Sequence, residues 1–228
     1  MPPLHRHQLA YLTPAGWQRI AQRDWDATSR ACLAHWATRR LPLVVTRQLA
    51  CDDESKDTVA LGLPAPGRWE RRRIALRVPH GDVMYFDEFP SVEQVMPLLP
   101  HLARAKWEHL AAGLKACGAT ARVYGSLGWQ HLSGLDHLRG SSDIDLWVAV
   151  SDPAQADAVA ALLQAFSHAR LWLDGELMFD GRDAVAWREW LAWRAGGAKA
   201  LLVKTITGSS LSHSVGAHEA VTRAEALA

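Results

Sequence analysis

Two aspartates, Asp143 and Asp145, are separated by a single residue, Ile144, within the apolar stretch 142–150. Side chains alternate between the two faces of a strand, so both carboxylates would project from the same face. Their Cα atoms would lie roughly 7 Å apart, close enough for two carboxylates to converge on one divalent cation. The pair is therefore a candidate magnesium site, with phosphate oxygens completing the coordination shell. A solvated polar strand face explains such a pair equally well.

A second acidic pair, Asp174 and Glu176, occupies alternate positions in the stretch 170–179. Leucine and phenylalanine fill most of the intervening positions, so these acids also project away from an apolar face. If the two strands are neighbours in one sheet, Asp174 or Glu176 would supply a third carboxylate to a metal site. Solvation of the strand face, or a local turn, accounts for these two acids equally well.

A Gly-Ser pair, Gly125 and Ser126, joins the apolar stretch 120–125 to a helix-like segment. A helix start leaves backbone N–H groups unpaired, and these groups together with the serine hydroxyl can hold a phosphate. Glycine allows the backbone to approach a ligand closely. On its own the pair is most often a simple turn. Followed along the chain by Asp143 and Asp145, it favours a site for a phosphate ester and a divalent cation.

The elements that must position these residues belong to a second part of the chain, residues 89–228. The alternation in 142–150 places four apolar side chains opposite the aspartates, so that face is expected to meet a core. Apolar residues at helical spacing predict a helix over 101–117, ended by glycine. The other expected elements are strands at 120–125, 170–179 and 200–206, and helices at 126–135, at 183–197 and from 153, the last with Val159, Leu162, Leu163 and Phe166 facing inward.

The first part, residues 1–88, has the pattern of a small domain that contains both helix and sheet. Thr13 followed by Pro14 is a helix-start signal, and the helix is expected to run to about residue 39. Apolar runs separated by polar, proline or glycine residues predict a small sheet. Its expected strands are residues 7–12, 41–48, 57–63 and 71–78.

The 228-residue chain has an ordinary composition, with 49% apolar and 21% charged residues and a net charge of +1. This balance gives no overall attraction to nucleic acid or to membranes, and neither is expected as a partner. Cys32, Cys51 and Cys117 form no closely spaced pair, which argues against a disulfide framework or a zinc site. Since no signal peptide and no apolar run of roughly 20 residues is apparent, a cytoplasmic location is expected.

The combined pattern resembles the nucleotidyltransferase superfamily with the DNA polymerase β-like fold. More narrowly, it resembles the phosphoribosyl-dephospho-CoA transferases of malonate decarboxylase, also called malonate decarboxylase holo-acyl-carrier-protein synthases. The resemblance is carried by ARVYGSLGWQHLSGL…RGSSDIDLWV and by LDGELMF, AVAWREWL, LLVKT, PLVVTRQ and RRRIALRV. It implies an α+β protein in which a small α/β N-terminal domain binds substrate or partner. A nucleotidyltransferase-like catalytic domain with a mixed sheet and flanking helices would follow.

The resemblance also implies a reaction. Family members transfer the phosphoribosyl-dephospho-CoA group from 2′-(5″-triphosphoribosyl)-3′-dephospho-CoA to a serine of the apo acyl carrier protein subunit of malonate decarboxylase, and pyrophosphate leaves. In this chain Asp143 and Asp145 would be catalytic and would bind Mg²⁺ or Mn²⁺. The third catalytic acid would be Asp174 or Glu176.

Substrate contacts follow from the same resemblance. Gly125 and Ser126 would hold the triphosphate, and Lys204 is the expected cation beside the leaving pyrophosphate, although an exposed strand lysine is the commoner explanation of such a residue. Two other functions stay open. One is a nucleotidyltransferase of the same fold that acts on another protein, RNA or a small molecule. The other is a non-catalytic module that binds the carrier protein.

Overall fold

A computed structural model describes residues 4–48, 57–166 and 172–215 of the chain. These residues form two compact units, and each unit is built from separated stretches of sequence. The N-terminal unit takes its residues from Met1–Phe89, Ser126–Arg139 and Ile206–Gly208. The C-terminal unit takes its residues from Pro90–Gly125, Gly140–Thr205 and Ser209–Ala228. No helix in the described ranges is long and apolar enough to cross a membrane.

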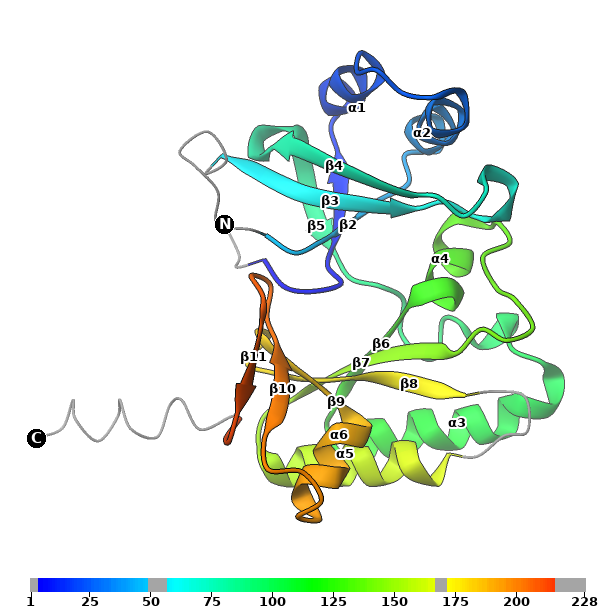
Figure 1. Cartoon of the computed structure of the whole chain (residues 1–228). Coiled ribbons are helices and arrows are strands. Elements are labelled where there is room, and N and C mark those ends of the chain that lie inside the picture. Colours follow the sequence, from blue (N-terminus) through cyan, green and yellow to red (C-terminus); the bar gives the residue numbers. More distant parts are fainter. Residues whose placement is uncertain (1–3, 49–56, 167–171, 216–228) are drawn as a thin grey trace, which may run out of the picture. The chain divides into compact units, whose positions relative to one another are not determined.

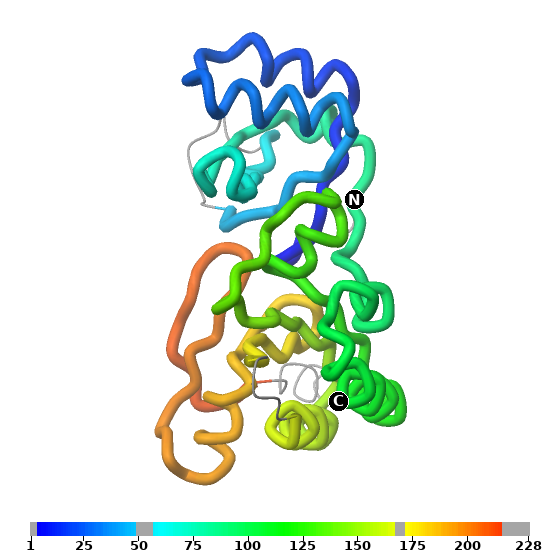
Figure 2. Tube along the Cα trace, turned by 90° about the vertical axis from the view of Figure 1, so that its right-hand side faces the viewer, coloured from blue at the N-terminus to red at the C-terminus, as the bar shows by residue number. Residues whose placement is uncertain are grey.

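The N-terminal unit contains a five-stranded antiparallel sheet with the strand order β4-β3-β2-β1-β5. Helices α1 and α2 lie on one side of this sheet (Figure 1; Figure 2). The strands are β1 (Leu9–Leu12), β2 (Leu43–Val45), β3 (Thr58–Pro64), β4 (Arg73–Pro79) and β5 (Val83–Asp87). The helices are α1 (Pro14–Ala21) and α2 (Ala27–Arg39), with single 3₁₀ turns at Gly67–Trp69 and His80–Asp82.

The helix expected from Pro14 to residue 39 is two helices, so that prediction is wrong in its length. Thr13 starts the first as predicted, because its hydroxyl accepts a hydrogen bond from the Gly16 backbone N–H at 3.0 Å. The chain then breaks, and Asp26 caps a new helix by accepting from the N–H groups of Thr28 and Ser29. A side chain that caps a helix start competes with continuation of the preceding helix, which explains the break.

The C-terminal unit contains a six-stranded sheet with the order β11-β10-β9-β8-β7-β6. Because β7 and β8 are parallel and the other pairs antiparallel, the sheet is mixed, as predicted. Helices α3, α5 and α6 lie on one side of it (Figure 1). The strands are β6 (Thr120–Tyr124), β7 (Ile144–Val150), β8 (Leu173–Phe179), β9 (Asp183–Ala186), β10 (Leu201–Lys204) and β11 (Ser209–Ser212). The helices are α3 (His101–Ala116), α4 (Gly125–Ser133), which passes into the N-terminal unit, α5 (Pro153–Ala165) and α6 (Trp187–Arg194), with a 3₁₀ turn at Met96–Leu98.

The helix-covered face of this sheet carries the core predicted from the alternation in β7. Ile144, Leu146, Val148 and Val150 are all buried, and Leu173, Leu177 and Phe179 continue the same layer on β8. Helix α3 contributes the expected apolar side chains of Ala103, Trp107, Leu110 and Leu114. Leu171, predicted to belong to this layer, lies outside the described residues. Since Ile144 and Leu146 point into this core, Asp145 between them is directed to the opposite face.

The helix predicted over residues 183–197 is wrong at its start. Residues Asp183–Ala186 form strand β9, which pairs antiparallel with β8, and the helix begins only at Trp187. Asp180 and Gly181, both with positive φ, form the tight connection between the two strands. Sheet pairing and burial of Ala184 and Val185 thus override the helix preference of alanine. Beyond the strand expected at 200–206, residues Ser209–Ser212 form a further strand, β11, that pairs antiparallel with β10.

Candidate functional site

Asp145 packs directly against the backbone at Gly125. The two residues come together because β6 and β7 pair antiparallel, with Tyr124 opposite Asp145. Gly125 has φ +59°, and a Cβ atom on it would lie 1.8 Å from Oδ2 of Asp145. Glycine is required here for both reasons, and its absence of a side chain is what lets the start of α4 approach the carboxylate.

We expect Gly125→Ala to lower the free energy of unfolding by about 2 kcal/mol, because alanine would need a left-handed conformation and would displace the Asp145 carboxylate. The same displacement should reduce any reaction that uses Asp145. Thermal unfolding and activity measured together test this expectation. Gly134→Ala is a matched control, since Gly134 also has a positive φ but nothing lies within 4 Å of its missing side chain. Equal effects of both substitutions on activity would contradict the role of the close approach.

Asp143 lies in the loop that precedes β7. The strand begins at Ile144, so the prediction of a strand from residue 142 is wrong by two residues, and Asp143 is exposed. Its charge still acts on Asp145, because it is one of the carboxylates that raise the pKa of that residue. A loop position leaves the Asp143 side chain free to follow a ligand, whereas Asp145 is held by the strand.

The second acidic pair lies on β8, the strand next to β7, which is the arrangement that a shared metal site requires. In the parallel register of β7 and β8, Asp174 lies directly opposite Asp145, and Glu176 lies opposite Trp147. Asp174 is exposed, and its Oδ1 accepts a hydrogen bond from the Gly175 N–H at 2.8 Å. The sheet register therefore brings Asp174 beside Asp145.

Glu176 and Lys204 form an ion pair. Nζ of Lys204, on β10, lies 2.9 Å from Oε1 of Glu176, and the glutamate is only 5% exposed. Lys204 is therefore half-buried and paired, and is not the exposed strand lysine that was the commoner expectation. Burial of a carboxylate is costly unless it is paired, so this lysine stabilises Glu176 inside the sheet.

Replacing Lys204 with methionine should lower the free energy of unfolding by about 2 kcal/mol, because a buried carboxylate loses its cation. The double variant Glu176→Gln, Lys204→Met should recover much of that loss. Urea unfolding of the two single variants and the double variant gives the coupling energy. Additive effects would show that the pair contributes nothing of its own.

Three neighbouring carboxylates and partial burial act on Asp145. Burial is the largest cause, followed by the charges of Asp174, Asp143 and Glu176, and together they raise its pKa from 3.8 to about 6. The folded chain thus gathers negative charge at one end of two adjacent strands. A cation bound there would favour the ionised carboxylate and lower that pKa.

The chemistry of these side chains fits a hard divalent cation. Carboxylate oxygens are the ligands that Mg²⁺ prefers, and Mg²⁺ is usually held by one or two carboxylates together with substrate phosphates and waters. Asp143 and Asp145 match that donor set. Within residues 4–48, 57–166 and 172–215, no three histidine, cysteine, aspartate or glutamate side chains are grouped as a complete metal-binding cluster.

A cavity of about 740 Å³ adjoins the acids within the C-terminal unit. Asp143 and Asp174 both line it, so the loop carboxylate and the β8 carboxylate open onto the same space. The remaining lining residues are Gly140, Ser141, Ser142, Trp172, Leu173 and Arg188. Small-molecule sites occupy roughly 300–1,000 Å³, so this cavity has room for a substrate.

Ser126 follows Gly125 at the start of α4, which is the strand-to-helix transition predicted from the sequence. It is half-buried and belongs to the N-terminal unit, whereas Gly125 belongs to the C-terminal unit. Binding of phosphate by the α4 start stays a prediction. The predicted close approach of the backbone at Gly125 is observed, and the group that approaches it is the Asp145 carboxylate.

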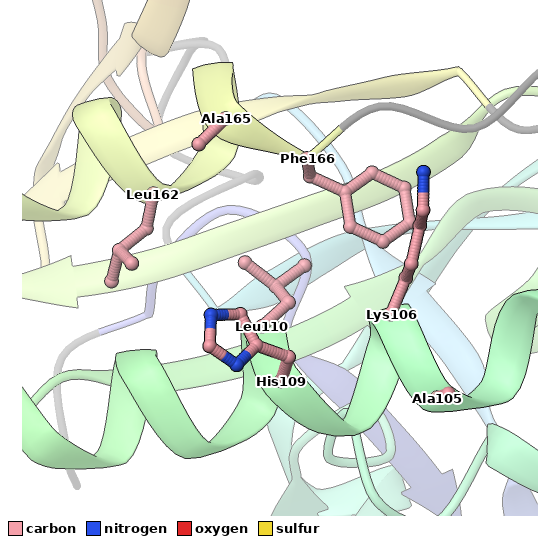
Figure 3. A pocket seen from close by; sticks show the side chains of 7 residues that line it. All are labelled: Ala105, Lys106, His109, Leu110, Leu162, Ala165 and Phe166. Atoms are coloured by element: carbon pink, nitrogen blue, oxygen red, sulfur yellow. The ribbon is translucent and has the colours of Figure 1, made fainter.

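A second cavity, of about 430 Å³, lies between α3 and α5 and contains none of the predicted site residues. Figure 3 shows Leu162 and Phe166 facing Leu110, His109 and Lys106 across it. Leu162 and Phe166 were predicted to be core residues, but both are half-buried and line this second cavity. The other two residues predicted to face inward, Val159 and Leu163, are buried as expected, so the buried apolar stripe of α5 is narrower than predicted.

Two residues of the larger cavity, Trp172 and Arg188, were not predicted as site residues. Arg188 lies on α6, yet its guanidinium donates to the Leu173 carbonyl at 2.7 Å, at the start of β8. It also stacks over the Trp187 ring at 4.1 Å. No local pattern indicates that a helix residue reaches back to a strand start. The one available signal was the position of Trp172, which shares its strand face with Asp174 and Glu176.

Comparisons with known proteins match both parts of the chain to one enzyme family. The Phosphoribosyl-dephospho-CoA transferase MdcG N-terminal domain matches residues 5–89, and the C-terminal domain of the same description matches residues 91–214. A phosphoribosyl-dephospho-CoA transferase of Bradyrhizobium diazoefficiens is 36% identical over 205 residues, which are 90% of this chain and 88% of the relative. One of Xanthomonas euvesicatoria is 33% identical over 202 residues, covering 88% and 90%.

A more distant relative, the phosphoribosyl-dephospho-CoA transferase of Pseudomonas putida, is 28% identical over 179 residues, which cover 77% of this chain and 82% of the relative. No solved structure matches the chain significantly. Both parts of the sequence are thus matched by the two domains of one enzyme family, and the relatives are covered over most of their length. The chain belongs to the phosphoribosyl-dephospho-CoA transferase family and is a transferase.

Proposed function

We propose that the chain transfers the phosphoribosyl-dephospho-CoA group from 2′-(5″-triphosphoribosyl)-3′-dephospho-CoA to a serine of the apo acyl carrier protein subunit of malonate decarboxylase. Pyrophosphate is the second product. Membership of the transferase family supports the transferred group. The observation that carries the chemistry is the convergence of carboxylates around Asp145, which matches a reaction at a phosphate held with a divalent cation.

Asp143 and Asp145 are the residues that we propose to hold Mg²⁺. When bound, the ion would neutralise the negative charge of the reacting triphosphate and of the departing pyrophosphate. Asp145 is fixed by β7 and by its contact with Gly125, whereas Asp143 can adjust from its loop. The chain thereby contributes mainly positioning and charge compensation, which is what phosphoryl and nucleotidyl transfer require.

Asp174 is the third acid that we propose. It lies opposite Asp145 and shares the cavity with Asp143, whereas Glu176 is already paired with Lys204. In the reaction, the serine oxygen of the carrier bonds to the α-phosphorus and the bond from that phosphorus to the leaving pyrophosphate breaks. Asp174 accepts the proton of the serine hydroxyl as the oxygen attacks.

Lys204 remains the cation that we propose for the departing pyrophosphate. Its ion pair with Glu176 holds the ammonium group on the sheet that carries the acids, and a leaving group that gains negative charge is stabilised by a fixed cation. Gly125 and Ser126 are proposed to hold the triphosphate through the start of α4. Both proposals extend the sequence predictions, and the rates of pyrophosphate release by the Lys204→Met and Gly125→Ala variants test them.

Release of pyrophosphate, followed with a coupled assay, tests this function. We expect release from triphosphoribosyl-dephospho-CoA only when the apo carrier protein is present, with one pyrophosphate for each carrier molecule. Release with ATP and carrier, but not with the proposed donor, would identify instead a nucleotidyltransferase of another specificity. Binding of the carrier without release from either donor would identify a non-catalytic carrier-binding module.

A further inference from the structure

Trp172 presents its indole to solvent beside the acid cluster. The side chain is 69% exposed, which is unusual for the largest apolar residue type. Its backbone is nevertheless fixed, since the Trp172 carbonyl accepts a hydrogen bond from the Ile144 N–H at 2.8 Å. The next residue, Leu173, pairs with Ile144 in the parallel register. An exposed aromatic ring on a fixed backbone offers a flat surface on which a ligand can stack.

Arg188 supplies a fixed cation to the same cavity. Its hydrogen bond to the Leu173 carbonyl and its stacking on the Trp187 ring hold the guanidinium plane from two sides. Neither contact neutralises the positive charge of Arg188, because neither a carbonyl group nor an aromatic ring carries a full negative charge. Guanidinium groups bind phosphates in a planar, bidentate manner, so a group held in this way is suited to a phosphate or diphosphate.

The cavity therefore has two chemically different regions. Asp143 and Asp174 line it with carboxylates, which repel phosphate unless a cation intervenes, while Trp172 and Arg188 offer stacking and positive charge. A ligand suited to both regions carries one phosphate group that binds through a metal, and also a flat ring with a second phosphate group. The cavity volume of about 740 Å³ leaves room for more than a triphosphate alone.

We propose that Trp172 and Arg188 form the subsite for the adenosine diphosphate portion of the donor, with the adenine stacked on the indole and the diphosphate on the guanidinium. This inference rests on the proposed function, which supplies the donor. In 2′-(5″-triphosphoribosyl)-3′-dephospho-CoA, the ribose that carries the reacting triphosphate is attached directly to the adenosine ribose. Two ribose units therefore separate the adenine and its 5′-diphosphate from the phosphate held at the acids, and the cavity lined by Asp143, Asp174, Trp172 and Arg188 offers a place for both ends of the donor.

Calorimetric titration of the full chain with dephospho-CoA tests the subsite without any transfer reaction. We expect Trp172→Ala to weaken binding by roughly 10-fold to 100-fold, since stacking of one base contributes about that factor, and Trp172→Phe to retain most of the affinity. Leu102→Ala is the matched control, because Leu102 is an exposed apolar residue of α3 outside the cavity. Unchanged affinity in Trp172→Ala would overturn the subsite.

Arg188 is tested with a pair of probes that differ only in phosphate. Arg188→Gln should weaken binding of ADP by about 10-fold and leave binding of adenosine unchanged, because the guanidinium contacts the diphosphate. Equal weakening of both probes would show that the substitution perturbs the fold near β8, and would overturn the assignment. Thermal unfolding of Arg188→Gln detects such a perturbation of the fold, since the substitution also removes the hydrogen bond from the guanidinium to the Leu173 carbonyl.

Transfer kinetics separate this inference from the proposed function. For Trp172→Ala we expect the KM for the donor to rise by about 10-fold or more while kcat changes little, because the ring binds a part of the donor that does not react. If the natural chain loads the carrier and Trp172→Ala keeps the same KM, the subsite is wrong and the function stands. If dephospho-CoA binding depends on Trp172 but no donor is transferred, the function is wrong and the subsite stands.

Discussion

Replacing Asp145 with asparagine is expected to reduce transfer by a factor of about 1,000 or more while making the substrate-free protein more stable at neutral pH. The loss of activity follows because Asp145 is the carboxylate at the centre of the acid cluster, in contact with Gly125 and opposite Asp174. Removing one charged group that stabilises a transition state commonly has an effect of this size. Initial rates of carrier loading measure it.

The gain in stability follows from the pKa of Asp145, which burial and the charges of Asp174, Asp143 and Glu176 raise from 3.8 to about 6. A raised pKa means that the fold favours the protonated acid. That contribution is complete below pH 3.8 and is lost as the pH rises through about 6. Above pH 6 asparagine, which stays neutral, should therefore stabilise the fold by about 2 kcal/mol, allowing for partial solvent access, and the difference should vanish below pH 4.

Thermal or urea unfolding of both proteins between pH 4 and pH 8 tests this expectation in metal-free buffer. Glu108→Gln is a charge-matched control, since Glu108 lies exposed on α3, away from the sheet face of the acids, and its loss should change neither stability nor transfer. An asparagine variant that is less stable than the natural chain at pH 8 would contradict the electrostatic account. One that loads the carrier at the normal rate would contradict the role of Asp145.

Removal of divalent cations is expected to stop transfer completely. Without a cation between them, the acids around Asp145 would repel the triphosphate, so the reacting phosphate would not be held against the carboxylates. Excess EDTA should therefore abolish carrier loading, and Mg²⁺ or Mn²⁺ should restore it. The two ions accept the same oxygen ligands in six-coordinate geometry.

A binding measurement makes the metal experiment independent of catalysis. In the presence of triphosphate, Mg²⁺ should raise the midpoint of thermal unfolding of the natural chain, because a ligand that binds only the folded state stabilises it. The same addition should have little effect on Asp145→Asn. Full turnover in excess EDTA would rule out the proposed mechanism, whereas an unchanged midpoint alone would rule out only the metal-binding role of Asp145.

Periodicity predicted the part of the site that depends on a single strand. The alternation in 142–150 determines which side chains of β7 meet the core, so burial of Ile144 and Leu146 and the opposite direction of Asp145 could be deduced without a structure. The prediction lost accuracy at the strand end, where Asp143 is in the loop. Hydrophobic patterning describes the buried part of a strand, and carries little information about polar residues at its ends.

The pairing of strands that are distant in the sequence could not be predicted, so the contribution of Asp174 or Glu176 to the site was stated only on the condition that the two strands are neighbours. Whether Asp174 lies beside Asp145 depends on β7 and β8 being neighbours and on their register, and no local pattern in the sequence determines either. The same holds for the ion pair of Lys204 with Glu176, which joins residues two strands apart in the sheet order. Such contacts arise from tertiary packing, which also converted Asp183–Ala186 from the expected helix into β9.

Arg188 shows a further reason why a sequence reading is incomplete. Within its segment, AVAWREWL, it reads as a solvent-facing helix residue, and only the fold brings its guanidinium to the start of β8. Gly125 is the opposite case. The sequence indicated that a glycine at this helix start allows close approach, and the structure identifies the Asp145 carboxylate as the group that approaches it.

The intact mass of the carrier protein is the measurement that tests the central claim most directly. After incubation of the chain with triphosphoribosyl-dephospho-CoA, Mg²⁺ and the apo acyl carrier subunit of malonate decarboxylase, we predict a gain equal to one phosphoribosyl-dephospho-CoA group. The gain should be absent when the acceptor serine is replaced by alanine and when Asp145→Asn replaces the natural chain. An unmodified carrier, or a gain that appears only with ATP, would contradict the proposed transfer.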